Sequence, residues 1–335
     1  MPNLQAIFLP AIETELQHQI SRLDDPRTKQ FHDMLTYHMG WTGEGAGLSA
    51  QGKRLRPMLL LLCCAACGGD WHNALPAAAS IELVHNFSLI HDDIQDRSDT
   101  RRGRTTLWSK WGMPQGINAG DALFAISNLS LLDLQPATSF ETVIKAAEII
   151  HTTCLNLTKG QFLDMSFENG SDHELDDYWV MVGGKTAALF SAACEIGSLI
   201  GQADTTIHEA YRNFGHYLGL AFQVRDDFLG IWGDATLTGK SIESDLVTGK
   251  LSLPVLFGLG KKSDFSKRWL AGAITADEVA PLSKQLEIEG AKLFSQQTED
   301  QLIDLALQNL RSANPEGTAG QELFDLVNKL IGRQV

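Results

Sequence analysis

Residues 82–104 read ELVHNFSLIHDDIQDRSDTRRGR and place Asp92, Asp93 and Asp96 at the end of a long, largely apolar segment. On a helix, residues four apart share a face, so Asp92 and Asp96 are expected to project together, with Ser88 and His85 one and two turns before them. Two neighbouring carboxylates repel each other, and a hard divalent cation with oxygen ligands relieves that repulsion. This stretch therefore predicts a long helix that ends in a metal site.

The rest of the chain has the composition of a globular protein without a membrane span. It has 335 residues, 44% hydrophobic and 20% charged, with a net charge of -14 that argues against nucleic-acid or anionic-membrane partners. The start of the chain lacks the pattern of a signal peptide, and the longest apolar run, residues 57–67, is shorter than the roughly 20 residues of a membrane helix. Five cysteines, an odd number, fit a reducing compartment, so we expect a cytoplasmic protein.

Helical periodicity follows most of the sequence, and no series of alternating strands occurs. The expected helical regions are residues 11–40 with a break near Pro26, the stretch after Pro57, 76–96, 119–134, 140–168, 174–201, 205–232, 252–262, 275–292, 294–312 and 320–332. Residues 97–118 are polar and basic and are expected to form a loop. Without a linker or a short repeat, the economical prediction is an all-α fold in one domain over residues 1–335.

A second acidic cluster follows far along the chain. Residues 222–230 read FQVRDDFLG, and helical spacing places Gln223, Asp227 and Gly230 near one face, with Asp226 beside them. The loop after this segment carries Lys240 and Lys250, as Arg101 and Arg102 follow the first cluster. Two acidic clusters, each followed by cations, predict a diphosphate site in which Mg²⁺ joins carboxylates to phosphate oxygens and cations bind the same oxygens.

An ordered set of motifs resembles the trans-isoprenyl diphosphate synthases, the polyprenyl synthetase family, most closely those that make geranylgeranyl or farnesyl diphosphate. The matching pieces are GKRLRP at 52–57, DDIQD with its trailing RRG, Gly120-Asp121, Gly160-Gln161, Gly184-Lys185-Thr186, Phe222-Gln223, Gly239-Lys240 and Ser244-Asp245-Leu246. The resemblance implies a single-domain bundle of long antiparallel helices around a central apolar cavity, with the two aspartate clusters across its mouth. It also implies a homodimer.

The resemblance assigns roles by position. Metal ions, two or three Mg²⁺ with Mn²⁺ as an alternative, would be held by Asp92, Asp96, Asp226 and Asp227. The catalytic set would be Asp92, Asp93, Asp96, Lys185 and Asp226. The allylic diphosphate would contact Arg101, Lys185, Thr186, Gln223 and Lys240. The diphosphate of the second substrate, isopentenyl diphosphate, would be held without metal by Lys53, Arg56, His85 and Arg102.

Product length depends, in this family, on the residues just before the first cluster. Phe87 and Ser88 stand five and four residues before Asp92, and DDIQD carries no insertion. This combination resembles synthases that stop at about twenty carbons, so geranylgeranyl diphosphate is the expected product, with farnesyl diphosphate as the alternative.

Two other functions stay open at the level of sequence. The second cluster ends in Gly230 where the first ends in Asp96, and Asp226, Asp227, Gly230 and Asp234 match the offsets of the metal motif of terpene cyclases. A cyclase with one diphosphate substrate would not need Lys53, Arg56, His85 and Arg102, which disfavours it. A non-catalytic subunit of a heteromeric synthase is the other alternative, and the intact first cluster disfavours that.

Overall fold

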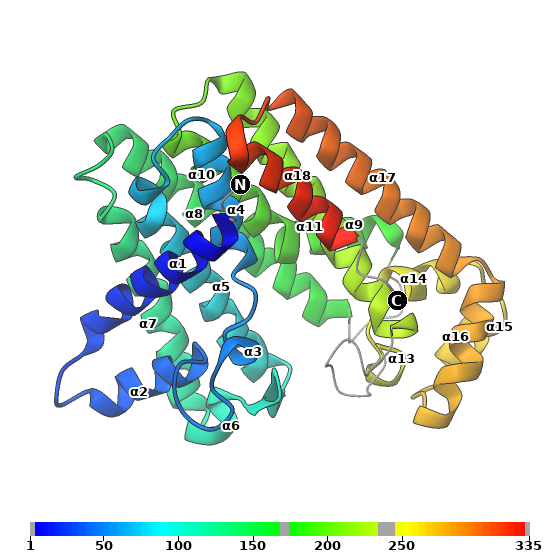
Figure 1. The fold of residues 1–335 in the computed structure, drawn as a ribbon. Coiled ribbons are helices and arrows are strands. Elements are labelled where there is room, and N and C mark those ends of the chain that lie inside the picture. Colours follow the sequence, from blue (N-terminus) through cyan, green and yellow to red (C-terminus); the bar gives the residue numbers. More distant parts are fainter. Residues whose placement is uncertain (1–3, 168–173, 234–244, 332–335) are drawn as a thin grey trace. The chain divides into compact units, whose positions relative to one another are not determined.

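The structure, a computed structural model, describes residues 4–167, 174–233 and 245–331 (Figure 1). The described residues are helical apart from one short hairpin and the connecting loops, which confirms the all-α prediction. Contacts divide the chain into two compact units. Unit 1 consists of Met1–Thr152, Ala192–Tyr211 and Ala313–Leu323, and unit 2 of Thr153–Ser191, Arg212–Ser312 and Phe324–Val335. The single-domain arrangement around one cavity stays a prediction.

Unit 1 contains the helices of the first part of the chain. They are α1 (Leu4–Ile20), α2 (Lys29–His38), α3 (Leu48–Gln51), α4 (Leu55–Ala66), α5 (Leu75–Gln95), α6 (Leu107–Trp111) and α7 (Met113–Leu132), with 3₁₀ turns at Ser21–Leu23 and Trp71–Ala74. Four longer helices contribute to both units: α8 (Phe140–Phe167), α10 (Ala188–Ile200), α11 (Thr205–Trp232) and α18 (Gly317–Ile331). The expected helical region 11–40 is thus two helices, which separate at the segment containing Pro26.

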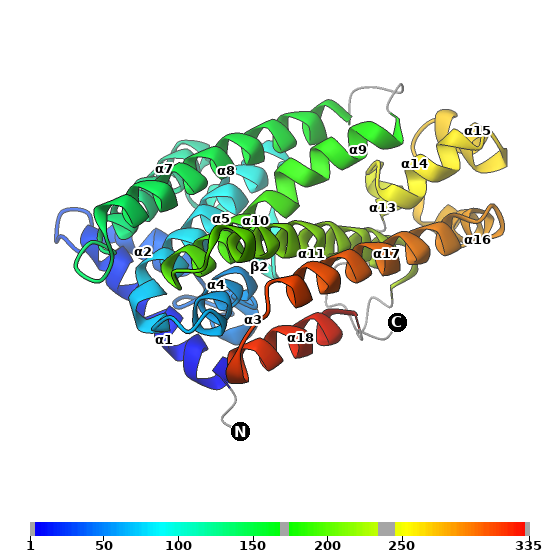
Figure 2. The same cartoon turned by 90° about the horizontal axis from the view of Figure 1, so that it is seen from above.

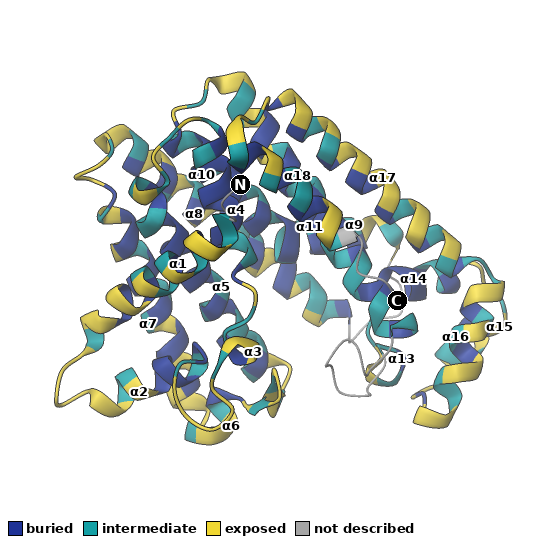
Figure 3. Ribbon diagram, in the orientation of Figure 1, coloured by how far each residue is buried: buried dark blue, intermediate teal, exposed yellow. Residues whose placement is uncertain are grey.

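Helix α5 is the central element of unit 1. It packs against α1, α4 and α7, and Figure 3 shows its buried residues in dark blue. Pro76 stands in its first turn, where a missing N–H costs nothing, and the helix ends with Asp96 as its C-cap. Small and apolar side chains are buried along most of its length. This burial holds the aspartates at the end of a rigid helix.

The segment 97–118 has more structure than the expected loop. Strands β1 (Thr100–Arg101) and β2 (Arg104–Thr105) form a tight antiparallel hairpin, and α6 and the start of α7 follow it. Arg102 and Gly103 make the turn with φ of 52° and 72°, the left-handed pair that favours a two-residue hairpin. The turn therefore presents Arg102 in a fixed conformation.

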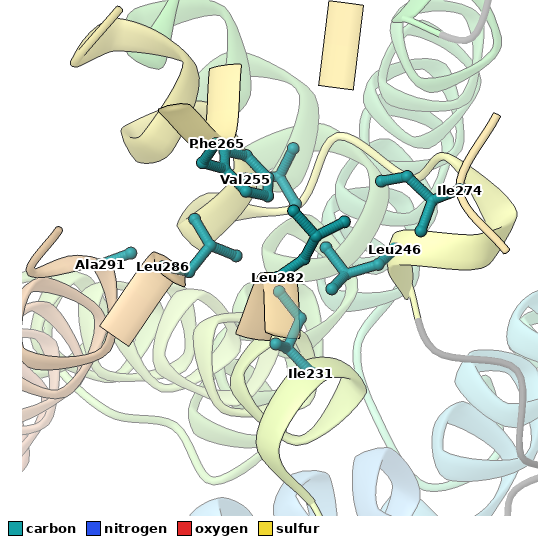
Figure 4. Close-up of a cluster of buried hydrophobic side chains, with 8 residues drawn as sticks. All are labelled: Ile231, Leu246, Val255, Phe265, Ile274, Leu282, Leu286 and Ala291. Carbon is teal, nitrogen blue, oxygen red and sulfur yellow. The ribbon is translucent and has the colours of Figure 1, made fainter. Parts of the chain in front are cut away.

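Unit 2 contains α9 (Leu175–Val182), α13 (Asp245–Thr248), α14 (Leu253–Gly260), α15 (Asp264–Leu270), α16 (Val279–Ile288) and α17 (Ala291–Ser312), with a 3₁₀ turn at Ala276–Glu278. Helix α17 runs along the unit 2 part of α11 (Figure 2). A buried cluster joins Ile231 at the end of α11 to Leu246 of α13 and to residues of α14 to α17 (Figure 4). Helix α15 was absent from the sequence expectation, and the region 275–292 is shorter as a helix than expected.

The expected helix over 174–201 is interrupted. Between α9 and α10, residues Gly183–Ala187 form a π-helical segment, η3. Two glycines explain the close packing here, because a methyl group on Gly160 of α8 would overlap the backbone N of Lys185, and one on Gly184 would lie 2.6 Å from the Asn156 carbonyl oxygen. Single π turns inside helices often mark functional sites. No helix in the described ranges combines the length and apolar content that crossing a bilayer requires.

Candidate active site

Each unit carries its own group of the predicted site residues. The α5 site comprises Lys53, Arg56, His85, Asp92, Asp93, Asp96, Arg101 and Arg102, and the α11 site comprises Lys185, Thr186, Gln223, Asp226 and Asp227. Lys240 lies outside the described residues.

The cations at the start of α4 differ in burial: one is buried in ion pairs and another is exposed to solvent. Arg54 is buried and donates to Glu13 at 2.6 Å and to Glu82 of α5 at 2.8 Å. It caps α4 in the left-handed conformation, with φ of 47°, a strained state that the ion pairs with Glu13 and Glu82 hold in place. Lys53 is exposed. Arg54 therefore fixes the segment so that its neighbours Lys53 and Arg56 keep their positions.

Arg56 and His85, which the family resemblance assigns to one binding group, lie side by side. Arg56 Nη1 lies 3.3 Å from His85 Nε2. Burial lowers the pKa of His85 well below its usual value, and the positive charges of Arg56 and Arg102 lower it further. The imidazole is therefore neutral, and its Nε2 accepts from the guanidinium. Burial also lowers the pKa of Arg56, to about 10.

Arg102 reaches the same part of unit 1 from the hairpin. Its Nη1 donates to the Ala50 carbonyl oxygen at 3.0 Å. Its guanidinium packs on Gly52, where a methyl group would lie 2.6 to 2.8 Å from the guanidinium atoms. Gly52 has φ of 79° and leaves the space that the arginine fills. The space that Arg102 of the RRG motif occupies therefore explains why the first residue of the GKRLRP motif is a glycine.

The three aspartates at the end of α5 have different surroundings. Asp93 is buried and accepts from Arg101 Nε at 2.7 Å, whereas Asp92 is half-buried and Asp96 is exposed. Burial raises the pKa of Asp93 to about 6, although Arg101 acts in the opposite direction. Asp93 thus orients Arg101, and Asp92 and Asp96 lie at the surface end of the helix.

The predicted chain-length residues lie on α5 before the aspartates. The Phe87 ring contacts Phe124 of α7, with centroids 5.2 Å apart, and meets His91 edge-on at 5.1 Å. The His91 ring in turn packs on Gly120, where a methyl group would overlap it. Ser88 is buried, and its hydroxyl donates to the His85 carbonyl oxygen at 2.8 Å. Phe87 is therefore one member of an aromatic pair between α5 and α7.

Asp227 is the centre of the α11 site. Its carboxylate is 1% exposed and accepts from Tyr178 Oη at 2.8 Å, Gln223 Nε2 at 2.9 Å, Lys250 Nζ at 3.0 Å and the Leu253 backbone N at 3.1 Å. Four donors match the number of lone-pair positions on a carboxylate. Asp227 therefore ties α9, α11 and the start of α14 together.

A hydrogen-bonded relay runs from the π-helical segment into this centre. Thr186 Oγ1 donates to Gln223 Oε1 at 2.8 Å, and Gln223 Nε2 donates to Asp227. Lys185, one residue earlier, forms an ion pair with Asp164 of α8 at 2.5 Å. The predicted residues Lys185, Thr186 and Gln223 thus belong to one connected part of unit 2.

The open side of the α11 site carries Asp226, which is half-buried, and a lysine between carboxylates. Lys250 Nζ lies 3.0 Å from Asp227 and 3.9 Å from Asp245. Burial would lower the pKa of Lys250, but Asp227, Asp245 and Asp226 around it raise the pKa overall. Lys250 is therefore a permanent cation within the acidic group.

The carboxylates of each site, taken separately, are of the kind that the predicted metal takes. Asp92 and Asp96 on α5 and Asp226 on α11 offer carboxylate oxygens, the hard ligands that Mg²⁺ takes, and Mg²⁺ is commonly held by one or two carboxylates together with substrate phosphates. Within residues 4–167, 174–233 and 245–331, no three histidine, cysteine or acidic side chains converge in a way that would hold a metal on their own.

Several residues of these sites escaped the sequence-based assignment of roles. Arg54, Asp164, Tyr178, Lys250 and Asp245 make contacts that join segments far apart in the chain. The signal for Asp164 is its spacing: it stands four residues after Gly160, on the helix turn that packs against Lys185. Lys250 and Asp245 fall in the segment that was expected as a basic loop after the second cluster, although Asp245 begins α13, and spacing alone does not show which charges turn inward.

Comparisons with known proteins identify similar chains over most of the length. Residues 46–286 match the family model described as polyprenyl synthetase. A geranylgeranyl diphosphate synthase of Mycobacterium tuberculosis is 38% identical over 308 residues, which cover 90% of this chain and 86% of that protein. A (2E,6E)-farnesyl diphosphate synthase of Mycobacterium bovis is 35% identical over 333 residues, covering 96% and 90%.

Solved structures agree with the fold. A polyprenyl synthetase from Streptomyces coelicolor A3(2) superposes with a TM-score of 0.85 at 31% identity, covering 96% of each chain. A polyprenyl synthase from Caulobacter crescentus CB15, solved in complex with calcium and isoprenyl diphosphate, superposes with a TM-score of 0.73 at 26% identity, covering 95% of this chain and 98% of that one.

Proposed function

The chain belongs to the polyprenyl synthetase family and is a trans-prenyltransferase that elongates isoprenyl diphosphates, and we propose that its product is geranylgeranyl diphosphate. This membership confirms the resemblance read from the motifs, and it replaces the alternatives of a cyclase and a non-catalytic subunit. Farnesyl diphosphate is the second candidate product, since relatives of both kinds are similar to this chain.

The aromatic pair of Phe87 and Phe124 is the observation that carries the product proposal. Ser88, four residues before Asp92, is small, so the bulk on this part of α5 comes from Phe87, whose ring is fixed against α7. A rigid ring pair limits the length of a growing chain because protein interiors do not deform to admit extra methylene groups.

The basic group of the α5 site is the proposed binding site for the diphosphate of isopentenyl diphosphate. Arg56, His85 and Arg102 contribute hydrogen-bond donors or orient them, and Lys53 adds an exposed cation. Arginine is suited to phosphate because its planar fork donates two parallel hydrogen bonds. The supporting observation is that Arg102 and Arg56 are each held by a specific neighbour, Gly52 and His85.

The allylic diphosphate is assigned to Arg101, Lys185, Thr186, Gln223 and Lys240, with Asp92, Asp96 and Asp226 as the proposed metal ligands. Mg²⁺, when bound, neutralises the charge that develops on the departing diphosphate. Asp227 was predicted as a further metal ligand, and its four hydrogen bonds favour instead a role in positioning Asp226, Gln223 and Lys250.

In this proposal, residues of the two sites bind and orient the two substrates of one condensation reaction. The allylic carbon–oxygen bond breaks, and the diphosphate leaves with the electron pair. The double bond of isopentenyl diphosphate, oriented by the α5 site, forms the new carbon–carbon bond, and a proton passes to the released diphosphate. Orientation of the two substrates supplies a large part of the rate, and the cations hold the charge of both diphosphates.

A homodimer is the proposed assembly. Helix α8 exposes the large apolar side chains of Phe140, Ile144, Leu155 and Phe162, and exposed apolar surface of this kind is typical of an interface. Replacing Ile144 and Phe162 by glutamate is expected to halve the mass measured by sedimentation. The same change at Leu270, an exposed residue of α15, is expected to leave the mass unchanged. A monomeric unsubstituted protein would contradict the proposal.

Product analysis tests the function directly. Purified protein is incubated with Mg²⁺, isopentenyl diphosphate and, in turn, dimethylallyl, geranyl or farnesyl diphosphate, and the products are separated by chain length. A twenty-carbon product from all three primers is expected. Accumulation of a fifteen-carbon product with no further elongation would replace geranylgeranyl by farnesyl diphosphate as the product.

A further inference from the structure

Arg104 stands on strand β2, two residues after Arg102, and neither the motifs nor the proposed function gives it a role. Arg104 is half-buried, and its guanidinium donates to three backbone carbonyl oxygens: Nη1 to Tyr37 at 2.7 Å, Nη2 to Thr42 at 2.7 Å and Nε to Glu44 at 2.9 Å. The same group lies over the Tyr37 ring, with the guanidinium carbon 3.9 Å from the ring centroid. One side chain therefore joins the hairpin to the end of α2 and to the loop that follows it, all within unit 1.

That loop, residues 40–47, is rich in glycine and closes around the Arg104 side chain. Gly43 and Gly45 have φ of 83° and 70°, in the left-handed region that glycine tolerates. A methyl group on Gly43 would lie 3.3 Å from Arg104 Nη2, and one on Gly45 would lie 3.3 Å from Arg104 Cγ. The two glycines thus leave the room that the arginine occupies.

The loop also holds the peptide group to which Arg102 donates. The Gly47 backbone N donates to the Gly40 carbonyl oxygen at 3.0 Å, which brings the two ends of the loop together. A methyl group on Gly40 would lie 2.6 Å from the Ala50 carbonyl carbon, so the two backbones are in direct contact. The Ala50 oxygen accepts from Arg102 Nη1 at 3.0 Å. Contacts therefore run in a closed ring from Arg104 through the loop to Ala50, and back through Arg102 to the same hairpin.

Arg101, which is assigned to the allylic diphosphate, has a separate anchor. Its Nε donates to the Asp93 carboxylate of α5 at 2.7 Å, and Asp93 is buried. Asp93 would still hold Arg101 if Arg104 were replaced. The effect of a change at Arg104 is therefore expected to fall on Arg102 and on the substrate assigned to it.

We propose that Arg104 is a positioning residue for the isopentenyl diphosphate site, which holds Arg102 in place and has the loop 40–47 as its receptor. The inference rests on the proposed function, since it takes Arg102 as a ligand of that diphosphate. A guanidinium is suited to this role because its fork reaches three acceptors in fixed directions, whereas a lysine carries all its donors on one atom.

A cycle of substitutions tests whether Arg104 acts through Arg102. Steady-state kinetics, with isopentenyl diphosphate and the allylic substrate varied in turn, are measured for the unsubstituted protein, Arg104→Met, Arg102→Met and the double variant. Arg104→Met keeps an apolar stem and is expected to raise the KM for isopentenyl diphosphate by about 10-fold, the effect of one lost charge-assisted hydrogen bond. The KM for the allylic substrate is expected to change much less. The double variant is expected to match Arg102→Met, because a residue that acts through Arg102 has no further effect once Arg102 is replaced.

Arg268→Met is the matched control. Arg268 of α15 also donates to two carbonyl oxygens of a loop, those of Gly272 at 3.1 Å and Ala273 at 2.9 Å, and it pairs with Glu278. It belongs to unit 2 and to neither site. Its replacement is expected to lower the midpoint of thermal unfolding and to leave both KM values unchanged, which separates a loss of stability from a loss of position.

Arg104→Lys provides a second variant at the same position. It keeps the charge without the fork, so it is expected to raise the KM for isopentenyl diphosphate by a smaller factor, and it replaces Arg104→Met in the cycle if that variant fails to fold. An unchanged KM in the variant used overturns the role of Arg104. Independent, multiplying effects in the double variant overturn it as well. An Arg102→Met variant with an unchanged KM for isopentenyl diphosphate overturns the proposed binding site instead.

Discussion

The guanidinium of Arg102 lies directly on Gly52, in the space where any other residue would place its side chain. Gly52→Ala is therefore expected to displace Arg102 and to raise the KM for isopentenyl diphosphate by at least about 10-fold, the effect of a lost charge-assisted hydrogen bond. The KM for the allylic substrate is expected to change much less. Steady-state kinetics with each substrate varied in turn measures both values.

Gly68→Ala is the matched control for this change. Gly68 has φ of 80°, as Gly52 has 79°, but a methyl group on Gly68 meets nothing within 4 Å. The control carries the same backbone strain without the clash, so its KM values are expected to stay at the unsubstituted level. Equal effects of the two substitutions would show that strain, and not Arg102, is responsible.

Substitutions of the neighbouring residues Asp227 and Asp226 are expected to have different effects on stability and activity. Asp227→Asn places an amide N–H₂ among four donors in a buried site, and the free energy of unfolding is expected to fall by about 3 kcal/mol. Asp226→Asn, half-buried, is expected to keep nearly the full free energy of unfolding while losing roughly 10-fold to 100-fold of its Mg²⁺-dependent activity. Urea denaturation and turnover assays on both variants measure this difference. An Asp227→Asn variant as stable as the unsubstituted protein would contradict the prediction.

The ring pair between α5 and α7 gives a prediction for product length. Phe87→Ala and Phe124→Ala each remove one ring of the pair, so both are expected to lengthen the product by at least one five-carbon unit. Mass spectrometry of the extracted products measures the length. Leu270→Ala removes an exposed apolar side chain of α15 and is expected to leave the product unchanged. Products of normal length from both phenylalanine variants would place the limit elsewhere.

His38 gives a prediction for pH dependence. Burial lowers its pKa to about 3, and the charges of Arg101, Arg102 and Arg54 contribute to that decrease, whereas the pKa is 6.5 in the unfolded chain. Between these values the unfolded state binds a proton that the folded state does not, so stability falls as the pH falls through this range. Relative to pH 7.5, the loss at pH 5 is about 2 kcal/mol from this residue.

Urea denaturation at pH 7.5 and pH 5 measures this contribution. His38→Gln has no titrating group at position 38, so its stability is expected to change by about 2 kcal/mol less between the two pH values than that of the unsubstituted protein. His18→Gln, an exposed residue of α1, is the control and is expected to keep the full acid sensitivity. An identical loss in His38→Gln and the unsubstituted protein would contradict the neutral imidazole.

Local sequence patterns predicted those features that local forces determine. The extent of α5 and its end at the aspartates followed from apolar spacing, whereas Arg56 and His85 were grouped by the family resemblance and their binding role stays a prediction. The hairpin at Arg102 was missed because its strands are only two residues long and their periodicity is too short to detect.

Long-range contacts explain what the sequence did not reveal. Nothing within the GKRLRP motif distinguishes Arg54, which is buried on Glu13 and Glu82, from its exposed neighbour Lys53. The four donors of Asp227 come from α9, α11 and residues 250–253, so its role depends on how those segments meet. A carboxylate pattern gives the type of chemistry, and tertiary packing decides which carboxylate is available for it.

The π-helical segment Gly183–Ala187 restricts the insertions and deletions that the chain can tolerate between α9 and α10. A π turn holds one residue more than an α turn, so it is the natural result of a single inserted residue. Deleting one residue there would restore regular α-helix and rotate α9 by about 100° relative to α10. Tyr178 and Lys185 could then no longer both keep their partners, so the number of residues in this turn is fixed by contacts on each side of it.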